Sequence, residues 1–403
     1  MESMHFILKS CSIKFIATSI LLAVSNFLGA QNTVERALYN EGYENLRHIS
    51  KPGKEIIFIE NGSSLNFQKS IPKLREDVLN LANEFKSQNI DVILLDRKIP
   101  ILRMHTSIDK REITPVWKSD FVFDEGMHEL KSNNYDSFKY ESFGKIDLKF
   151  YPVFRFKNAR LDVMYLLQFN INPTLEISLW RGAKMTAQVI FPVVNDYSVE
   201  EGTIRPGFIT LSQQFRLPSN IYANLTIGNF NTFRGGADLK LYKSLSKKIG
   251  VYAQASLTSY SFPMFNDWLY SGIDKFTWKV GANYAYKPLK MIFNLSVQKF
   301  LANDLSVRGE VTRYFKNSAV GFYVQSMAIP DYPVNGGFFF AFSLPPYKHN
   351  RNKFVRVRSG DYFSLEYIAR PYEQHGRYFT TSPDENSSYN FFNKIHLSQI
   401  FEN

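Results

Sequence analysis

The sequence contains a single cysteine, Cys11, which lies just ahead of an apolar run over 15–24. Two lysines precede this run and small residues ending in Ala30 follow it, so residues 1–30 predict a secretory signal that is cut after Ala30. A membrane anchor is disfavoured because the run has about ten residues, whereas a spanning helix needs ~20. The mature chain would then hold no cysteine, which excludes a disulfide, a thiolate-metal site and a cysteine nucleophile.

Catalytic motifs are also missing. The sequence has no Gly-x-Gly-x-x-Gly, no phosphate-binding loop and no Gly-x-Ser-x-Gly elbow, and His128-Glu129 lacks the second histidine that a zinc protease needs. The seven histidines are scattered along the chain. We therefore expect no enzyme activity, no metal and no cofactor. A Ser-His pair on a barrel wall is the enzymatic alternative, although no motif marks one.

Alternation of apolar and polar residues dominates the chain from Lys145 onward. Apolar residues recur at alternate positions over 146–156, 161–171, 221–227, 249–257, 278–284, 291–297 and 338–344. A period of two gives a strand with one apolar and one polar face, and roughly ten such residues between turns are typical of a barrel in lipid. Residues 145–370 therefore predict a mainly β fold, an antiparallel outer-membrane β-barrel of roughly 12–14 strands. Aromatic residues make up 16% of the chain, which suits girdles at two membrane interfaces; a soluble β-sandwich is the alternative.

Residues 31–106 predict a small α/β domain ahead of the barrel. A short helix over 34–41 and strands over 45–49 and 55–59 lead to an amphipathic helix over 70–89 and a strand over 91–95. After export this domain would lie in the periplasm of a Gram-negative bacterium. Residues 107–144 could form a linker or fold into the barrel mouth, and residues 371–403 could form a tail or the last barrel strand.

Positive charge is concentrated in the predicted barrel. The chain has a net charge of +11, and residues 145–403 alone have +12. The basic residues on the polar face of their strands are Lys149, Arg155, Lys184, Arg216, Lys240, Lys279 and Arg308. If the strands close, these side chains converge on a water-filled interior that attracts polyanions, although Glu176, Glu310 and Glu366 share the same face.

The position of this charge matters for folding and for partners. Because interior charges would face water, we expect their substitution to tune permeation and to leave folding largely intact. The alternative is that much of the excess lies on rims and loops, where it would contact lipopolysaccharide phosphates. We do not expect nucleic acid as a partner, because an exported barrel meets surface polymers and not genomes.

Aromatic residues also fall on the polar face of the strands, namely Tyr151, Trp180, Tyr222, Tyr242 and Tyr252. Sugars are recognised by aromatic faces and by polar hydrogen-bonding groups, and acidic sugars also by Lys and Arg. These five residues are therefore candidates for stacking on a sugar. The alternative is that each fills the barrel or belongs to an interfacial girdle.

Several stretches of the predicted barrel carry loose motifs. They are 296–304 (Ser-Val-Gln-Lys-Phe-Leu-Ala-Asn-Asp), 311–317, 336–345, Gly228-Asn229-Phe230 with 234–242, and Trp180-Arg181-Gly182 with Pro192 and Asn195. In these stretches the chain resembles the YjbH family, outer-membrane proteins encoded with exopolysaccharide and capsule genes, in which the first stretch reads Gly-Arg-Tyr-Leu-Ala-x-Asp. The leading α/β unit is similar as well. The chain departs from the family at Lys299 (usually Arg), Ser318 (a turn Gly) and Asp238 (near an expected Glu), and it is shorter than long members.

The resemblance implies a role in producing or exporting an extracellular polysaccharide, and it carries over no active site. We therefore predict a non-enzymatic outer-membrane β-barrel that takes part in exopolysaccharide or capsule export or assembly. Its expected partners are outer-membrane lipid, lipopolysaccharide, the extracellular polysaccharide, and other polysaccharide-export proteins that would dock on the periplasmic domain. The alternatives are a general or anion-preferring diffusion porin and a structural or surface-attachment barrel.

Overall fold

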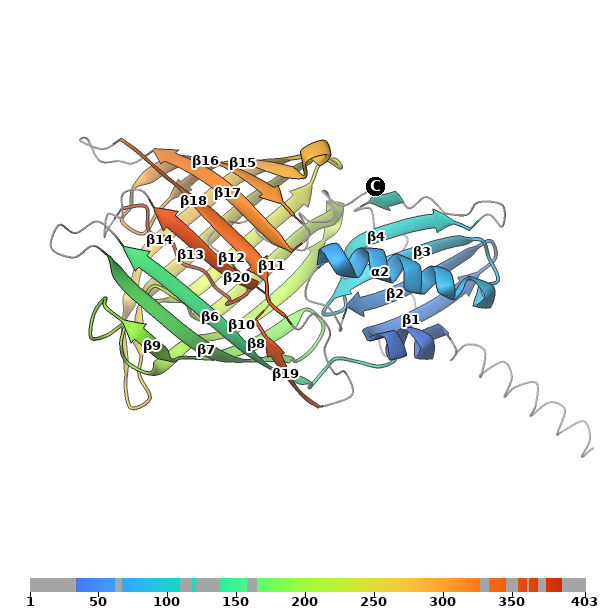
Figure 1. Cartoon of the computed structure of the whole chain (residues 1–403), viewed down its shortest axis with the longest axis horizontal. Coiled ribbons are helices and arrows are strands. Elements are labelled where there is room, and N and C mark those ends of the chain that lie inside the picture. The colour runs from blue at the N-terminus through green and yellow to red at the C-terminus, as the bar shows by residue number, and fades with distance from the viewer. Residues whose placement is uncertain are drawn as a thin grey trace, which may run out of the picture.

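The computed structural model contains two sheets, one of five strands and one of fifteen (Figure 1). It describes residues 34–61, 67–108, 118–120, 138–157, 165–315, 317–326, 333–345, 354–360, 362–368 and 375–385. The predicted signal over 1–30 with Cys11 lies outside these ranges, as do parts of the predicted segments 107–144, 161–171 and 371–403.

The first element of the N-terminal domain is a short helix over 34–41. Its further elements are β1 (Tyr43–Lys51), β2 (Lys54–Asn61), α2 (Phe67–Asn80), the 3-10 helix η1 (Ala82–Glu84), β3 (Asn89–Asp96), β4 (Ile99–Ser107) and β5 (Lys118–Asp120). The strand order is β1-β2-β3-β4-β5. Only β2 and β3 run parallel, because α2 carries the chain across between them. Leu74 and Val78 of α2 and Leu38 of the first helix belong to one core cluster with Ile57 and Val92 of the sheet.

This domain confirms the predicted α/β order and changes some of its bounds. The second helix ends at Asn80 and not at residue 89, because a 3-10 turn and an extended segment precede β3. Part of the segment over 107–144, for which the sequence left a linker and a barrel-mouth segment open, belongs to the domain, since β5 pairs with β4 at the edge of its sheet.

The large sheet runs from Ile146 to Ile368. Its strands are β6 (Ile146–Lys157), β7 (Leu166–Ser178), β8 (Ala183–Ile190), β9 (Pro192–Asn195), β10 (Arg205–Leu217), β11 (Ile221–Asn229), β12 (Arg234–Ser244), β13 (Ile249–Pro263), β14 (Trp268–Tyr286), β15 (Met291–Lys299), β16 (Leu305–Tyr314), β17 (Ser318–Ser326), β18 (Val334–Ser343), β19 (Val355–Ser359) and β20 (Tyr362–Ile368). The 3-10 turns η3 (Pro218–Asn220) and η4 (Lys287–Leu289) join β10 to β11 and β14 to β15. Neighbouring strands are antiparallel, except that β19 runs parallel to β6.

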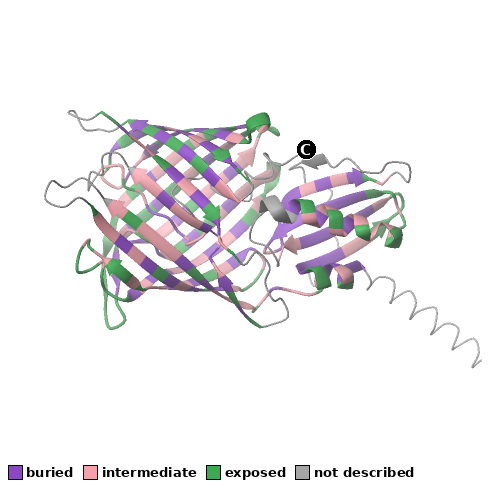
Figure 2. Ribbon diagram, in the orientation of Figure 1, coloured by how far each residue is buried: buried purple, intermediate pink, exposed green. Residues whose placement is uncertain are grey.

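Burial alternates along the strands of the large sheet as the sequence predicted (Figure 2). In β15, Leu295 is 60% exposed whereas the next residue, Ser296, is 1% exposed. In β17, Phe322 is exposed and Tyr323 is buried. The apolar side chains therefore point outward from the curved sheet and the polar ones point inward, which is the reverse of a soluble sandwich core.

The two ends of the large sheet lie beside each other at β6. The hydrogen-bonded order runs from β19 through β6 to β20, and no ladder between described strands joins β20 to β6. Gly360, between β19 and β20, donates its N–H to Phe150 O of β6 at 2.7 Å, and the Phe156 and Tyr367 rings stack with centroids 5.6 Å apart. The sheet is thus antiparallel-dominated and rolled, and its ladder is open at this seam. Among the described residues its hydrogen-bonded order contains fourteen strands, and β9 pairs with β7 beside this order.

The N-terminal domain contacts one end of the large sheet, here called the near end; the opposite end is the far end (Figure 1). The β3–β4 turn reaches into this end: Gln214 of β10 donates to Asp96 Oδ2 at 3.1 Å, and Gly182 N donates to Arg97 O at 2.9 Å. On the other side of the contact, Arg356 of β19 donates to Glu44 of β1 at 2.8 Å.

Among the described residues, no helix has both the length and the apolar character needed to cross a membrane.

Candidate functional site

The inward side of the large sheet gathers most of the predicted basic residues. Lys149 of β6 is 5% exposed and Arg308 of β16 is 3% exposed. The side chains of Lys184 of β8 and Lys240 of β12 are also largely buried. Strand alternation brings these residues together because each stands on the polar parity of its strand.

Carboxylates compensate these cations. Glu176 of β7 lies between two of them, with 2.9 Å to Lys149 Nζ and 3.3 Å to Lys184 Nζ. Because Glu176 can neutralise only one of these two ammonium groups, one positive charge remains. Asp384 balances this charge at 3.2 Å from Lys184 Nζ. Lys149 and Lys184 therefore belong to a buried ion network instead of facing water. Their burial leads us to expect that their substitution affects folding, contrary to the expectation from the sequence.

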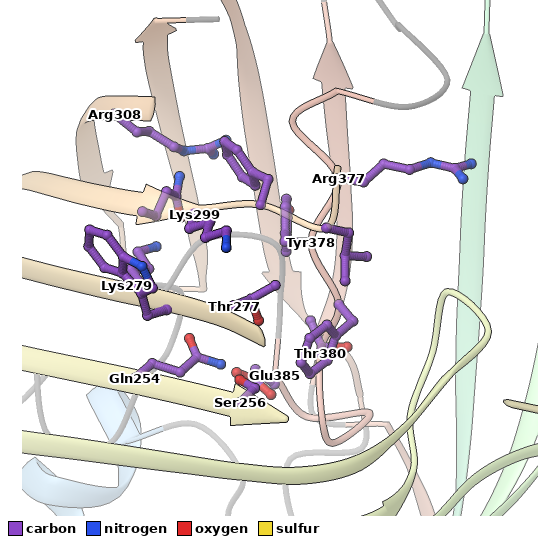
Figure 3. A pocket seen from close by; sticks show the side chains of 15 residues that line it. Gln254, Ser256, Thr277, Lys279, Lys299, Arg308, Arg377, Tyr378, Thr380 and Glu385 are labelled. Carbon is purple, nitrogen blue, oxygen red and sulfur yellow. The ribbon is translucent and has the colours of Figure 1, made fainter. Parts of the chain in front are cut away.

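Asp384 belongs to a segment that lies inside the sheet. This segment, residues 375–385, has no strand or helix and is here called the inner segment. Lys240 Nζ donates to Glu385 and, at 3.0 Å, to Thr381 Oγ1. Figure 3 shows Tyr378, Thr380 and Glu385 among side chains from the surrounding strands. Within the predicted segment 371–403, the described residues 375–385 form no strand and lie in the interior; the other residues of that segment lie outside the described ranges.

The β15–β16 turn holds the inner segment at the far end. Leu301 N donates to Arg377 O at 3.1 Å, and Gly376 N donates to Asp304 Oδ2 at 2.9 Å. Asp304 is the last residue of the stretch 296–304 that carries the family resemblance. This motif therefore has a structural task in the chain, which is to anchor the inner segment.

The β11–β12 turn provides a second anchor. Thr380 N donates to Asn231 Oδ1 at 2.7 Å, and the Phe379 ring stacks on Phe230 with centroids 5.4 Å apart. Phe230 ends another stretch that resembles the family, Gly228-Asn229-Phe230. Two motifs that are distant in sequence thus meet on the same segment.

Arg308 lies at the centre of the interior network. Its guanidinium donates to Glu310 Oε1 at 2.7 Å and to Glu366 Oε1 at 3.3 Å. Its carbon Cζ lies 3.7 Å from the centre of the Tyr323 ring. Tyr378 of the inner segment donates to the second oxygen of Glu366 at 2.6 Å, so the same carboxylate links the wall to the segment.

The other predicted basic residues are less enclosed. Arg155, at the far end of β6, is 46% exposed in its side chain and lies 3.3 Å from Glu201. Arg216 and Lys279 are half-buried, and Lys279 Nζ lies 5.8 Å from the centre of the Tyr252 ring. The seven predicted residues are therefore one inward-facing set, of which only the far-end member reaches solvent to a large extent.

Three predicted tyrosines form a row across the wall. Tyr222 pairs with Tyr242, and Tyr242 pairs with Tyr252, on the adjacent strands β11, β12 and β13. A Cβ atom on Gly250 would collide with Tyr242, and one on Gly281 would collide with Tyr252. The hydroxyl ends of Tyr242 and Tyr252 thus lie over glycines of the neighbouring strand, which supports the interpretation that these rings fill the interior.

The remaining two aromatic candidates are separate from this row. Tyr151 of β6 is buried and covers Gly360, where an added Cβ atom would lie 2.7 Å from the ring. Trp180 is 52% exposed in the β7–β8 turn, and its ring N–H donates to Gln213 Oε1 at 2.7 Å. Gln213 stands between two inward-facing residues, so this contact places Trp180 toward the outer face.

A cavity of about 480 Å³ lies in the interior beside the inner segment. Its wall includes a row of buried polar residues on β7, Gln168, Asn170 and Asn172. The Oδ1 atoms of Asn170 and Asn172 accept no hydrogen bond from the described part of the chain. Its other side is formed by the inner segment, including Tyr378 and Thr380. Buried amides with free acceptors beside aromatic rings suit a polar, hydroxyl-rich ligand.

The β3–β4 turn closes off part of the near end. Lys98 Nζ donates to Glu141 at 2.7 Å, and Lys98 N donates to Glu60 Oε2 at 3.2 Å. Burial and the neighbouring Asp96 carboxylate raise the pKa of Glu60. Burial alone would lower the pKa of Arg97, but Asp96 and, more weakly, Tyr222 and Asp384 raise that pKa. Charged groups of this turn therefore hold together the contact between the N-terminal domain and the large sheet.

Sequence reasoning missed Asp384, Glu385 and the Asp96-Arg97 turn, which complete the site, and it named Asp304 only as part of the stretch 296–304. Asp384 and Glu385 stand in a stretch without alternation, so no pattern assigned them to the interior. The one available signal was the pairing of two acidic residues downstream of a barrel whose inward face is basic.

Among the described residues, no group of three or more His, Cys, Asp or Glu side chains is arranged to hold a metal ion. Comparison of the chain with models of known families, with characterised proteins and with solved structures finds no match.

Proposed function

We propose that the chain is an outer-membrane β-barrel that takes part in the export or assembly of an extracellular polysaccharide. The observation that carries this proposal is the combination of an apolar outer face and a charged, hydrogen-bonded inner face on one rolled sheet. Such a surface is stable only where lipid covers the outside.

Closure of the barrel is part of the proposal. Tyr367 of β20 stacks on Phe156 of β6, and Gly360 donates to Phe150. In lipid, an unpaired strand edge costs several kcal/mol for each unsatisfied backbone group, which favours closing the remaining seam. The N-terminal domain would then lie in the periplasm. Near-end turns over 179–182, 218–220, 245–248 and 287–290 are short, as periplasmic turns are, and the far end carries the long excursion over 191–204, although 230–233 and 264–267 are short as well.

The interior supports a polysaccharide role over a constantly open porin. The inner segment runs inward from the far-end turns to the interior lysines, and the β3–β4 turn occupies part of the near end, so a diffusion pathway would first require their movement. The far half keeps a cavity lined by amides and aromatic rings, which are the groups that recognise sugars. The resemblance to the YjbH family points to the same role.

Cell fractionation and gel migration test the membrane part of the proposal. We expect the protein in outer-membrane fractions, with different migration before and after boiling, because a closed barrel resists detergent. The double variant Val280→Glu with Leu295→Glu places charges on the outer face and should reduce the folded fraction, with a cost per site below the about 2–4 kcal/mol of a lysine or arginine at the bilayer midplane. Val199→Glu, in an exposed loop, is the control. Recovery as a soluble periplasmic protein would favour the sandwich instead.

Gene deletion tests the polysaccharide part. Cells without the gene should release or display less extracellular polysaccharide, and the wild-type gene should restore it. Normal polysaccharide together with lost uptake of small solutes would favour the porin, and lost surface adhesion alone would favour the attachment barrel.

A further inference from the structure

The two acidic residues at the end of the inner segment occupy interior cations. Asp384 lies 3.2 Å from Lys184 Nζ, and Glu385 pairs with Lys240. Among the described residues, the strand carboxylates that contact these two lysines include Glu176, which Lys149 shares, and Asp238 at 3.5 Å from Lys240. Without the inner segment this part of the wall would therefore hold more ammonium groups than carboxylates.

We propose that Lys184 and Lys240 form a binding site for the carboxylates of an acidic polysaccharide, and that Asp384 and Glu385 occupy this site until the polymer displaces them. The inference rests on the proposed function and adds its substrate class and its regulation. A uronic-acid polymer presents carboxylates and hydroxyls together, and such carboxylates would make the same charge-assisted hydrogen bonds to both lysines.

The attachment of the inner segment makes displacement feasible. The segment pairs with no strand, and it is held by side chains and by two far-end turns. Elements held in this way open at lower free energy than the strands of a ladder. Removing Asp384 and Glu385 costs little in the wall only if other carboxylates replace them, because the lysines would otherwise remain buried and undercompensated.

The cavity gives a polymer access to the segment. Thr380, Ser382, Pro383 and Glu385 all contribute to its wall. The cavity is therefore bounded on one side by the element that would move, and the amides of β7 face that element across the space. A sugar chain entering the cavity would meet hydroxyl partners first and the lysine-bound carboxylates next.

A thiol introduced by Thr380→Cys, in a Cys11→Ser background, reports whether the segment leaves the wall. Thr380 is 8% exposed, so a maleimide should label the thiol slowly in the folded, detergent-solubilised full chain. We expect Asp384→Asn with Glu385→Gln to raise the labelling rate by about tenfold or more, because that rate follows the open population. Glu200→Gln with Asp267→Asn removes two exposed carboxylates and should leave the rate unchanged.

Polymer addition is the direct test. Polygalacturonate should raise the labelling rate of the Thr380→Cys protein, whereas dextran, which has no carboxylates, should not. Exchanging the charges by Lys240→Glu with Glu385→Lys keeps the pair and should therefore keep labelling slow. This variant lacks one of the two cations of the site and keeps Lys184, so its response to polygalacturonate should be weaker than that of the wild-type pair.

Equal labelling in the wild-type and neutralised proteins would overturn the proposal, as would an equal response to dextran. A charge-exchanged protein that responds fully to polygalacturonate would also overturn it. None of these measurements needs a membrane or an export assay. If the labelling tests fail while fractionation and polysaccharide production are as expected, the displacement site is refuted and the proposed function stands. If the polymer raises labelling but the protein is not in the outer membrane, the proposed function is refuted and the displacement site stands.

Discussion

At the scale of single residues, the interior is organised by ion pairs of which the sequence predicts the cation but not its partner. Alternation placed Lys149, Lys184 and Arg308 on the inward face, because side-chain direction follows from position in a strand. Their partners could not be read in this way. Asp384 is 200 residues away from Lys184 in the chain, and no local pattern encodes such a contact.

Arg308 gives the sharpest residue-scale prediction. Arg308→Gln would leave Glu310 and Glu366 buried without their shared cation, and loss of one partner of a buried pair costs about 3–5 kcal/mol. Arg313→Gln, on the outward parity of the same strand, should cost less than about 1 kcal/mol because that side chain is exposed. Urea unfolding in detergent, followed by the heat-dependent gel shift, measures both. Similar losses for the two variants would contradict the buried network.

Asp91 in the N-terminal domain predicts a pH dependence. Burial alone would raise the pKa of Asp91, but hydrogen bonds from Lys54 and His105 and the charge of Arg103 lower it. A carboxyl group with a lowered folded-state pKa stabilises the fold above its unfolded pKa of about 3.9, and this contribution is lost as the pH falls through the folded pKa.

Asp91→Asn should therefore destabilise the domain near neutral pH and approach wild type in acid. Hydrogen exchange of the β3 amides of Val92 and Ile93 between pH 7 and pH 3, corrected for intrinsic exchange, measures the difference. A difference that stays constant across this range would show that the Asp91 charge contributes nothing.

At the scale of elements, the wall is shaped by aromatic rings that lie on glycines. Tyr252 covers Gly281, and Phe339 and Tyr323 cover Gly321 and Gly337 in the same manner. Alternation placed Tyr252 on the polar face of its strand, yet it gave no register, so the glycine beneath the ring could not be named. Register comes from the pairing of strands, which depends on turn lengths and packing throughout the sheet.

Gly281 tests this arrangement. A Cβ atom there would collide with the Tyr252 ring and lie 2.7 Å from Leu295 O. We expect Gly281→Ala to cost about 1–3 kcal/mol, as overpacking does. Gly309→Ala, where a Cβ atom would have open space, should be neutral or stabilising by up to about 1 kcal/mol. Thermal unfolding of the two variants under one condition compares them, and the opposite order would mean that the rings do not rest on the glycines.

At the scale of the whole molecule, the sequence predicted two units but not their contact. The small α/β domain and the long alternating region were both recognisable from periodicity. The joint between them is made by a turn, Asp96-Arg97, whose role depends on its position between two sheets. A turn has no alternation of apolar and polar residues, so the pattern that predicted the strands could not predict this contact.

The joint can be loosened without touching either core. Asp96→Ala with Arg97→Ala removes the hydrogen bond from Gln214 and the buried guanidinium. We expect faster hydrogen exchange around Gly182 and Gln214 and an unchanged rate in β3. Lys51→Ala with Pro52→Ala alters the exposed β1–β2 turn of the same domain and should change neither. Protection at Gly182 that survives the first variant would mean that the domain is held elsewhere, for example by Arg356 and Glu44.

The covalent connection between β20 and the inner segment has a quantitative consequence for competition. A group tethered to its own site by a short link acts at an effective concentration on the order of mM. A single uronic acid at lower concentration would therefore compete poorly with Asp384 and Glu385, whereas a chain that presents many carboxylates gains avidity from rebinding. Such a tether would filter ligands by length, so that monomers and short fragments leave the interior closed and only a polymer opens it.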